Sequence, residues 1–258
     1  MDAPSRLIVA LTPFVLLAQP ARAQTQRPSM LSSRQCNENA LELRLDPHPF
    51  QDVVGPRFSL AVVDGKALVV IIVHDCSQYW IDGRSLGPAQ DLRIWVAIAG
   101  LDDIRPVVGA ERTLPTRTWY NLLEASSNPQ VREAKLAAGI PDAVIDSVFL
   151  VAPGAAAGGR VYLGGNLAFS WRIPSPAVPS VRLVGLNLDV YRRDSAGSIL
   201  LNRIQALMHV SADPSPATLE VVGGTGAVPF ISPGTYLVSA RVFFPMWSRA
   251  TLGLAPMR

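Results

Sequence analysis

Residues 67–73 read Ala-Leu-Val-Val-Ile-Ile-Val, and the chain continues through His74-Asp75-Cys76 and Ser-Gln-Tyr-Trp-Ile-Asp to Gly83. Seven unbroken apolar residues, several of them β-branched, are typical of a strand that is buried on both faces. The run is much shorter than the roughly 20 apolar residues of a membrane-spanning helix. It therefore predicts the central strand of a sheet, with a histidine, an aspartate and a cysteine directly after it.

Strand-like runs and turn signals recur along the chain and predict its fold class, mainly β with a small helical insertion. Asp64-Gly65 and Asp82-Gly83 are typical two-residue hairpin turns, and prolines and glycines separate the other apolar runs. We expect an α+β part over residues 36–153, with its central strand at 67–73. Residues 160–258 read as nearly pure β and predict a β-sandwich or Greek-key-like part.

The helical insertion is expected within residues 116–139, as two short helices. Trp119, Leu122 and Leu123 share a helical face, and Asn128-Pro129 supplies an N-cap and a first helical residue. Gly139, followed by a proline two residues later, is a typical helix stop. Both helices should pack across one end or face of the sheet.

The first residues predict an export signal. Arg6 precedes an apolar run over residues 7–18, Pro20 breaks that run, and Ala21-Arg22-Ala23 provides a cleavage site after Ala23. We expect residues 1–23 to be removed and residues 24–35 to form a flexible leader. No other run approaches the length of a transmembrane helix. The mature chain should therefore be a soluble protein of the periplasm or the cell exterior, without a membrane span.

The charge of the mature chain argues against a nucleic-acid partner. Loss of Arg6, Arg22 and Asp2 with the signal lowers the formal net charge from +3 to +2. This charge is too small and too scattered for nucleic-acid binding. A small molecule, a carbohydrate or a protein remains as the expected partner.

The two cysteines, Cys36 and Cys76, predict a disulfide, because an even number of cysteines in an exported chain favours pairing. The alternative is a nucleophilic Cys76 activated by His74, two residues earlier. Residues at that spacing on a strand lie about 6 to 7 Å apart, which is awkward for a direct hydrogen bond. The disulfide is the interpretation that we adopt.

The hairpin of residues 181–211 has a register that its sequence selects. A three-residue loop at 195–197, with Gly197 in a left-handed conformation, pairs Leu188 with Ile204 and Asp189 with Arg203. A four-residue loop would mix the apolar and polar faces. The polar face predicted by the three-residue loop is a candidate binding face and consists of Asn187, Asp189, Tyr191, Arg203, Gln205 and His209.

A second candidate binding surface is the aromatic turn at Tyr79, Trp80, Asp82 and Arg84. Aromatic rings beside an acidic and a basic group can stack on a sugar or anchor a protein partner. The alternative is that one ring packs in the core while the other covers the edge of the sheet. The corresponding alternative for the hairpin face is a solvated outer surface.

The sequence lacks the usual catalytic and metal-binding motifs. It has no Gly-x-Ser-x-Gly, no phosphate-binding loop and no His-Glu-x-x-His, and its three histidines lie on separate runs. We expect no metal and no cofactor, and we expect a non-catalytic binding or structural module. The alternative is a small-molecule enzyme or carrier with scattered polar groups in a β-lined cavity, either the hairpin face or His74, Asp75, Glu111 and Arg112.

Overall fold

The computed structural model describes residues 29–254, except for 101–102, 139, 141–142, 152–156, 177–181, 195–196, 212, 224–227 and 229. Its strands are β1 (Ser29–Leu45), β2 (Val62–Val63), β3 (Lys66–Ile81), β4 (Arg84–Ala97), β5 (Arg112–Thr113), β6 (Arg117–Ser126), β7 (Ala143–Val151), β8 (Ala157–Leu163), β9 (Asn166–Ile173), β10 (Val184–Arg193), β11 (Ile199–Val210), β12 (Ser215–Val221) and β13 (Gly234–Leu254). Its helices are α1 (His48–Val54) and α2 (Pro129–Ala137). The predicted fold class, mainly β with a small helical insertion, is confirmed.

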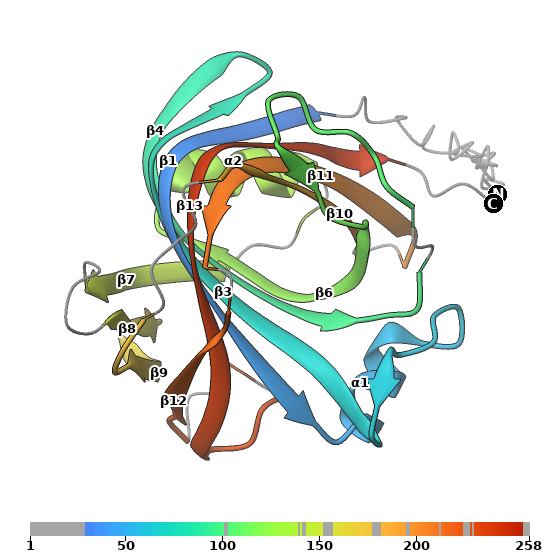
Figure 1. Cartoon of the computed structure of the whole chain (residues 1–258), viewed down its shortest axis with the longest axis vertical. Coiled ribbons are helices and arrows are strands. Elements are labelled where there is room, and N and C mark those ends of the chain that lie inside the picture. Colours follow the sequence, from blue (N-terminus) through green and yellow to red (C-terminus); the bar gives the residue numbers. More distant parts are fainter. Residues whose placement is uncertain are drawn as a thin grey trace, which may run out of the picture.

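The strands close two rings that share one wall (Figure 1). The shared wall consists of β13, β1, β3, β4 and β6, each paired with the next. The first ring is completed by β10 and β11, which join β6 to β13. The second is completed by β7, β8, β9 and β12 between the same two strands. Strands from both halves of the sequence therefore belong to one sheet.

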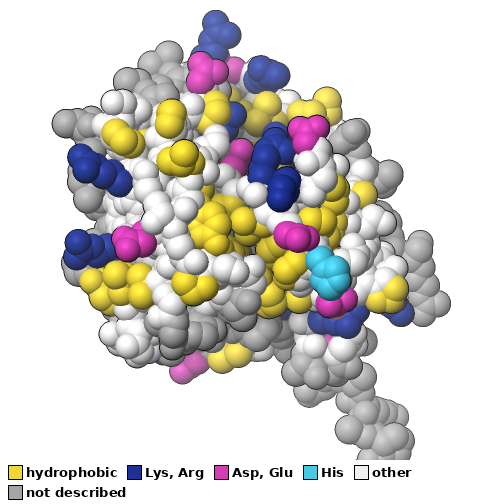
Figure 2. All heavy atoms as spheres, turned by 90° about the horizontal axis from the view of Figure 1, so that it is seen from below, with side chains coloured by type: hydrophobic (Ala, Val, Ile, Leu, Met, Phe, Trp, Pro, Cys, Tyr) yellow, Lys and Arg dark blue, Asp and Glu magenta, His cyan; other side chains and the backbone are white. Residues whose placement is uncertain are grey.

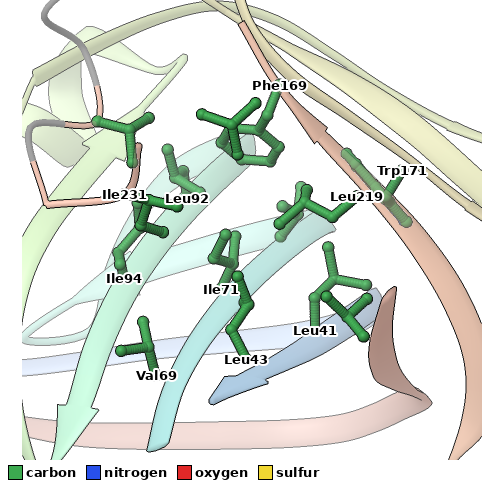
Figure 3. Close-up of a cluster of buried hydrophobic side chains, with 14 of the residues drawn as sticks. Leu41, Leu43, Val69, Ile71, Leu92, Ile94, Phe169, Trp171, Leu219 and Ile231 are labelled. Atoms are coloured by element: carbon green, nitrogen blue, oxygen red, sulfur yellow. The ribbon is translucent and has the colours of Figure 1, made fainter. Parts of the chain in front are cut away.

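The central strand β3 is buried on both faces because it forms part of both rings. Val69, Ile71 and Val73 pack in the core of the second ring, whereas Val70 and Ile72 pack in the first. Figure 3 shows the core of the second ring, where side chains of β1, β3 and β4 point toward those of β9 and β12. The continuous apolar run from Ala67 to Val73 is explained by these two cores.

Strand β6 replaces the first of the two helices predicted within 116–139. Trp119 faces the core of the first ring and Tyr120 that of the second, so the strand needs apolar residues on both faces. A register shift opposite Ile94 and Trp95 further disturbs the alternation of its side chains. The spacing of Trp119, Leu122 and Leu123 therefore resembles that of apolar residues on one face of a helix, although these residues lie in a strand.

Helix α2 is the predicted second helix. The side-chain oxygen of Asn128 accepts hydrogen bonds from the backbone N–H groups of Gln130 at 2.9 Å and Val131 at 3.4 Å, and Pro129 is the first helical residue. The amide of Asn128 also donates to the carbonyl oxygens of Leu86 and Pro88 on β4. The cap therefore also fixes the start of α2 against the sheet.

The predicted hairpin register is confirmed. Strands β10 and β11 pair Leu188 with Ile204 and Asp189 with Arg203, and Gly197 has φ of +81°.

The predicted flexible leader over residues 24–35 is wrong for residues 29–35, because residues from Ser29 onward belong to β1, which pairs with β3 and β13. The predicted export signal and its cleavage site lie outside the described residues. Of the described helices, none is long and apolar enough to cross a bilayer.

The surface seen from below carries hydrophobic side chains in its middle, with charged groups beside them (Figure 2). Basic and acidic side chains lie next to one another on this face. Positive charge is therefore not collected into one continuous patch there.

Candidate functional site

A row of polar side chains crosses three neighbouring strands of the shared wall. The pairing places Glu38 of β1 opposite His74 of β3, and His74 opposite Asp91 of β4. Directly opposed residues on a sheet lie about 4.5 to 5.5 Å apart and share a face. The distance from Glu38 Oε2 to His74 Nδ1 is 3.5 Å, and that from His74 Nε2 to Asp91 Oδ2 is 3.2 Å. Register alone thus assembles a carboxylate, an imidazole and a second carboxylate.

Asp91 is the centre of this cluster, and its side chain is fully buried. Its Oδ2 accepts hydrogen bonds from the Tyr79 hydroxyl at 2.9 Å and from Lys135 Nζ at 3.3 Å, and Arg93 Nη2 lies 3.6 Å away. Burial by itself would raise the pKa of Asp91, but the positive charge of Lys135, helped by His74 and Arg93, holds that pKa well below its ordinary value. Asp91 is therefore ionised throughout the neutral range.

Lys135 reaches this cluster from α2. The helix packs on β3 and β4 through Val131, which shares a small apolar cluster with Tyr79 and Leu86. One turn later, Lys135 extends inward with only 1% of its side chain exposed. Its Nζ lies 3.3 Å from Asp91 Oδ2 and 3.3 Å from Glu124 Oε2 of β6. A buried ammonium group is thus held between two carboxylates.

Further buried groups surround the lysine. Glu124 also accepts a hydrogen bond from Asn121 at 3.3 Å. Arg192 of β10 donates from Nη2 to the carbonyl oxygen of Ala138, at the end of α2, at 2.8 Å. Burial lowers the pKa of Arg192 to about 10, although Glu124 opposes that shift. Arg192 joins the far strand of the first ring to the helix that carries Lys135.

Tyr79 keeps its hydroxyl proton. Burial, reinforced by the charge of Asp91, raises the pKa of Tyr79 well above its ordinary value. Its hydroxyl donates to Asp91 and lies 2.7 Å from His74 Nε2. Tyr79, His74 and Asp91 Oδ2 therefore form a compact triangle.

A cavity in the first ring borders this cluster. Its volume accessible to water-sized molecules is about 30 Å³, and part of it is open to solvent. Its polar wall consists of Ser33, Glu38, His74, Arg93 and Ser248. Its apolar wall includes Ile72, Trp95, Leu186, Leu188, Ile204 and Met208. A mainly apolar lining with a few convergent polar groups is usual in small-molecule sites.

Lys135 and Asp91 lie directly behind the polar wall of this cavity. Neither residue lines the cavity itself, but His74 and Arg93 of the wall both contact Asp91. Burial would lower the pKa of Arg93, but Glu124, Tyr79 and Asp91 raise it, so its guanidinium stays charged. In the described part of the chain, no group of three or more His, Cys, Asp or Glu residues is arranged to hold a metal ion.

The structure separates the residues of the predicted aromatic turn. Tyr79 is buried in the cluster, whereas Trp80 is half-buried on the opposite face, where Arg34 lies 5.5 Å from its ring centroid. Asp82 and Arg84 are exposed, and Asp82 accepts a hydrogen bond from the backbone of Met30. Binding of a ligand at these four residues stays a prediction.

The predicted hairpin face lies on the outside of the first ring, since Leu186 and Leu188 between its residues line the cavity. Asn187 is buried and donates to the carbonyl oxygen of Arg105, while Gln205 donates to Asn187 at 3.1 Å. Asp189 lies 2.9 Å from Arg105 and 3.7 Å from Arg203.

Arg105 therefore covers part of this face. Tyr191 is half-buried, with its ring 5.1 Å from that of Phe58, and His209 is half-buried on β11. A binding role for the hairpin face stays a prediction.

The predicted disulfide between Cys36 and Cys76 is present, with an S–S distance of 2.03 Å. It joins directly opposed residues of β1 and β3, on the same side of both strands as the opposed pair of Glu38 and His74. Both sulfur atoms are thereby committed, and neither is a nucleophile.

The alternative enzyme site proposed from the sequence is only partly assembled. His74 belongs to the cluster, whereas Asp75 follows it on the opposite face of β3. Glu111 and Arg112 are exposed on a distant segment. The sequence interpretation missed Glu38, Asp91 and Lys135. The sequence marks them only weakly. Glu38 and Asp91 are charged residues within strand-like runs, and Lys135, on the predicted helix, is one of only two lysines in the chain.

Solved structures share this arrangement of elements. No protein-family model matches the chain, and no curated protein matches it in sequence. Acetoacetate decarboxylase from Legionella pneumophila is similar with a TM-score of 0.56 and 12% identity, over 93% of this chain and 93% of that chain. The chain has the fold of the acetoacetate decarboxylases.

Two further structures support the same assignment of fold. The enduracididine biosynthesis enzyme MppR in complex with pyruvate has a TM-score of 0.52 and 13% identity, over 95% of this chain and 96% of that one. An acetoacetate decarboxylase-like enzyme from Sphingomonas wittichii RW1 has a TM-score of 0.52 and 10% identity, over 90% of this chain and 94% of that one.

The expectation of a non-catalytic binding or structural module is contradicted by these likenesses. The solved structures that share the fold are described as enzymes that act on small molecules. The catalytic motifs sought in the sequence are short patterns of other folds, whereas the residues of this cluster are brought together by strand register. The alternative, a small-molecule enzyme with polar groups in a β-lined cavity, agrees better with the findings.

Proposed function

We propose that the protein is an enzyme that acts on a small oxo acid through an imine formed with Lys135. The observation that carries this proposal is the burial of Lys135 behind the cavity wall, with Nζ 3.3 Å from both Asp91 and Glu124. Lysine is rarely buried without a structural or chemical reason. The only other lysine, Lys66, is exposed next to a turn.

A lysine amine attacks a carbonyl carbon, and the imine that results draws electrons from the neighbouring carbon atoms. Loss of carbon dioxide or of a proton next to the imine carbon then becomes easier. The fold supports this chemistry, since similar structures are described as acetoacetate decarboxylases and as a complex with pyruvate. Acetoacetate and pyruvate are both small oxo acids.

The cavity contains groups suited to the carboxylate of such a substrate. Arg93 and Trp95 both line it, and within the described residues neither Arg93 Nε nor Trp95 Nε1 has a hydrogen-bond partner. A buried donor without an acceptor costs about 1 to 3 kcal/mol. A bound carboxylate or carbonyl oxygen would relieve that cost, while the charge of Arg93 would attract the anion.

Lys135 has to move for this reaction, because it does not line the cavity. Its Nζ leaves Asp91 and passes the polar wall to reach a carbonyl group in the cavity. The proposal also includes export to the periplasm or the cell exterior, which the predicted signal and the disulfide support.

The proposal is tested by reductive trapping. The mature, oxidised protein is mixed with acetoacetate or with pyruvate and treated with sodium borohydride, which converts an imine to a stable secondary amine. Peptide mass spectrometry then locates the adduct. We expect it on Lys135, together with release of carbon dioxide from acetoacetate above the uncatalysed rate.

Two variants make the trapping experiment specific. Lys135→Arg keeps the buried positive charge but removes the nucleophile, so it should give no adduct and no activity. Lys66→Arg is the matched control and should be labelled like the wild type. The proposal fails if the wild-type protein gives no adduct, or if Lys66 is the lysine that is modified.

A further inference from the structure

His74 joins the cavity to the buried lysine. It lines the cavity and also lies 3.2 Å from Asp91 Oδ2, which is bound to Lys135 Nζ. Arg93 lines the cavity and contacts Asp91 as well, but its guanidinium keeps its protons. Imidazole can take up and release a proton near neutral pH. His74 is therefore the group of the wall that can exchange a proton with groups in the cavity.

The neighbouring hydrogen bonds define where the protons lie. The Tyr79 hydroxyl donates its single proton to Asp91, so it acts as the acceptor in its 2.7 Å contact with His74 Nε2. Nε2 therefore carries a proton and points toward the buried side. Nδ1 faces Glu38 Oε2 at 3.5 Å, and both residues lie in the cavity wall. The two ring nitrogens thus face different proton acceptors.

We propose that His74 is the proton-relay residue of imine formation, a role that rests on the function proposed for Lys135. Formation of the imine joins Nζ to the carbonyl carbon and breaks the carbon–oxygen bond, with the oxygen leaving as water. Starting from the ammonium group, Nζ loses two protons and the departing oxygen gains two. His74 Nδ1 takes each of these protons from Nζ once the amine has entered the cavity, and delivers it to the departing oxygen. Asp91 and Tyr79 meanwhile hold the proton on Nε2 and stabilise the charged ring.

The charges around His74 suit this task. Glu38 faces the ring from β1, Asp91 and Arg93 from β4, and Tyr79 from β3 itself, while Lys135 of α2 acts through Asp91. Two carboxylates on opposite sides of the ring stabilise its protonated form during the transfer. Arg93 and Lys135 balance these carboxylates, so the cluster does not accumulate net negative charge as a proton passes.

The test measures how fast the imine forms. The mature protein is mixed with pyruvate, samples are quenched with borohydride at increasing times, and the adduct on Lys135 is quantified by mass spectrometry. His74→Gln preserves a polar group of similar reach that cannot carry an extra proton. We expect its labelling rate to fall about 100-fold, the low end for general acid–base catalysis. The final labelled fraction should remain as in the wild type.

The pH profile separates a relay from a structural role. The limb of the wild-type profile that depends on His74 should be absent in His74→Gln. Glu38→Gln is the second variant, because Glu38 is partly exposed in the cavity and its change leaves the buried ion pairs of Asp91 intact. It should fold normally, slow labelling and shift the pH profile. His48→Gln, which changes an exposed histidine outside the cluster, is the control and should behave as the wild type.

Each outcome decides one point. Labelling of His74→Gln and Glu38→Gln at the wild-type rate, with an unchanged pH profile, overturns the relay while the function proposed for Lys135 stands. Absence of any adduct in the wild type overturns both. Slow labelling with a normal final level and an altered pH profile supports the relay.

Discussion

Replacement of Asp91 by asparagine should strongly destabilise the fold. Asp91 is completely buried, and its Oδ2 contacts Lys135 at 3.3 Å, His74 at 3.2 Å and Tyr79 at 2.9 Å. The uncharged amide of the variant would leave the buried ammonium of Lys135 with one carboxylate in place of two. Breaking a buried ion pair costs about 3 to 5 kcal/mol. For a domain of this size, that loss lowers Tm by about 6 to 20 °C.

The assay is equilibrium unfolding in urea and thermal unfolding, with Asp189→Asn as the matched control. Asp189 forms ion pairs with Arg105 and Arg203 near the surface, where such pairs contribute about 1 kcal/mol or less. Asp189→Asn should therefore unfold close to the wild type. If Asp91→Asn lies within about 1 kcal/mol of the wild type, the ion-pair cluster does not stabilise the fold to the extent that its burial implies.

The same variant predicts a pH dependence. The pKa of Asp91 is well below its ordinary value in the folded protein, so its contribution is fully present above the unfolded pKa of about 4. It is lost as the pH falls through the lower pKa of the folded state. The stability difference between wild type and Asp91→Asn should thus be constant from about pH 7 to pH 5 and shrink only in stronger acid. A difference that already shrinks within that neutral to mildly acidic range would contradict the low pKa.

Three further perturbations test the fold. Replacing both Cys36 and Cys76 with alanine removes a link between residues 40 apart in sequence, and it should cost about 4 kcal/mol in urea unfolding; equal stability of wild type and variant would contradict this. Asn128→Ala removes the cap of α2 and should lower the unfolding free energy by about 1 to 2 kcal/mol, whereas exposed Ser77→Ala should not. Gly197→Ala places a side chain at φ of +81° and should cost about 1 kcal/mol; a more stable variant would show that the loop does not need glycine.

Local patterns in the sequence predicted much of the fold. The apolar run of Ala67 to Val73, the cap at Asn128 and the loop at Gly197 each depend on neighbours in the chain, and the structure has them as expected. The cysteine pair was predictable because two cysteines leave only one pairing. The strand Arg117–Ser126 was not predictable, because a strand between two cores has apolar residues on both faces and so lacks the alternation of apolar and polar residues that marks a strand.

The candidate site could not be predicted in the same way. Glu38, His74 and Asp91 are widely separated in sequence and meet only through the register of β1, β3 and β4. Lys135 joins them because α2 follows β6 and packs back on the sheet. No short motif encodes these contacts, so the residues that suggest chemistry became visible only with the paired strands.

The pairing of β1 with β13 also determines when the fold can form. Ser29 lies opposite Leu252, so strands from the two ends of the described chain are neighbours in the shared wall. Contacts between residues so distant in sequence form slowly, because a long loop must close first. Neither ring can close before the last strand has been synthesised, and until then the apolar faces of β3 and β4 are open to water. An emerging chain of this protein should therefore depend on protection from aggregation until β13 is available.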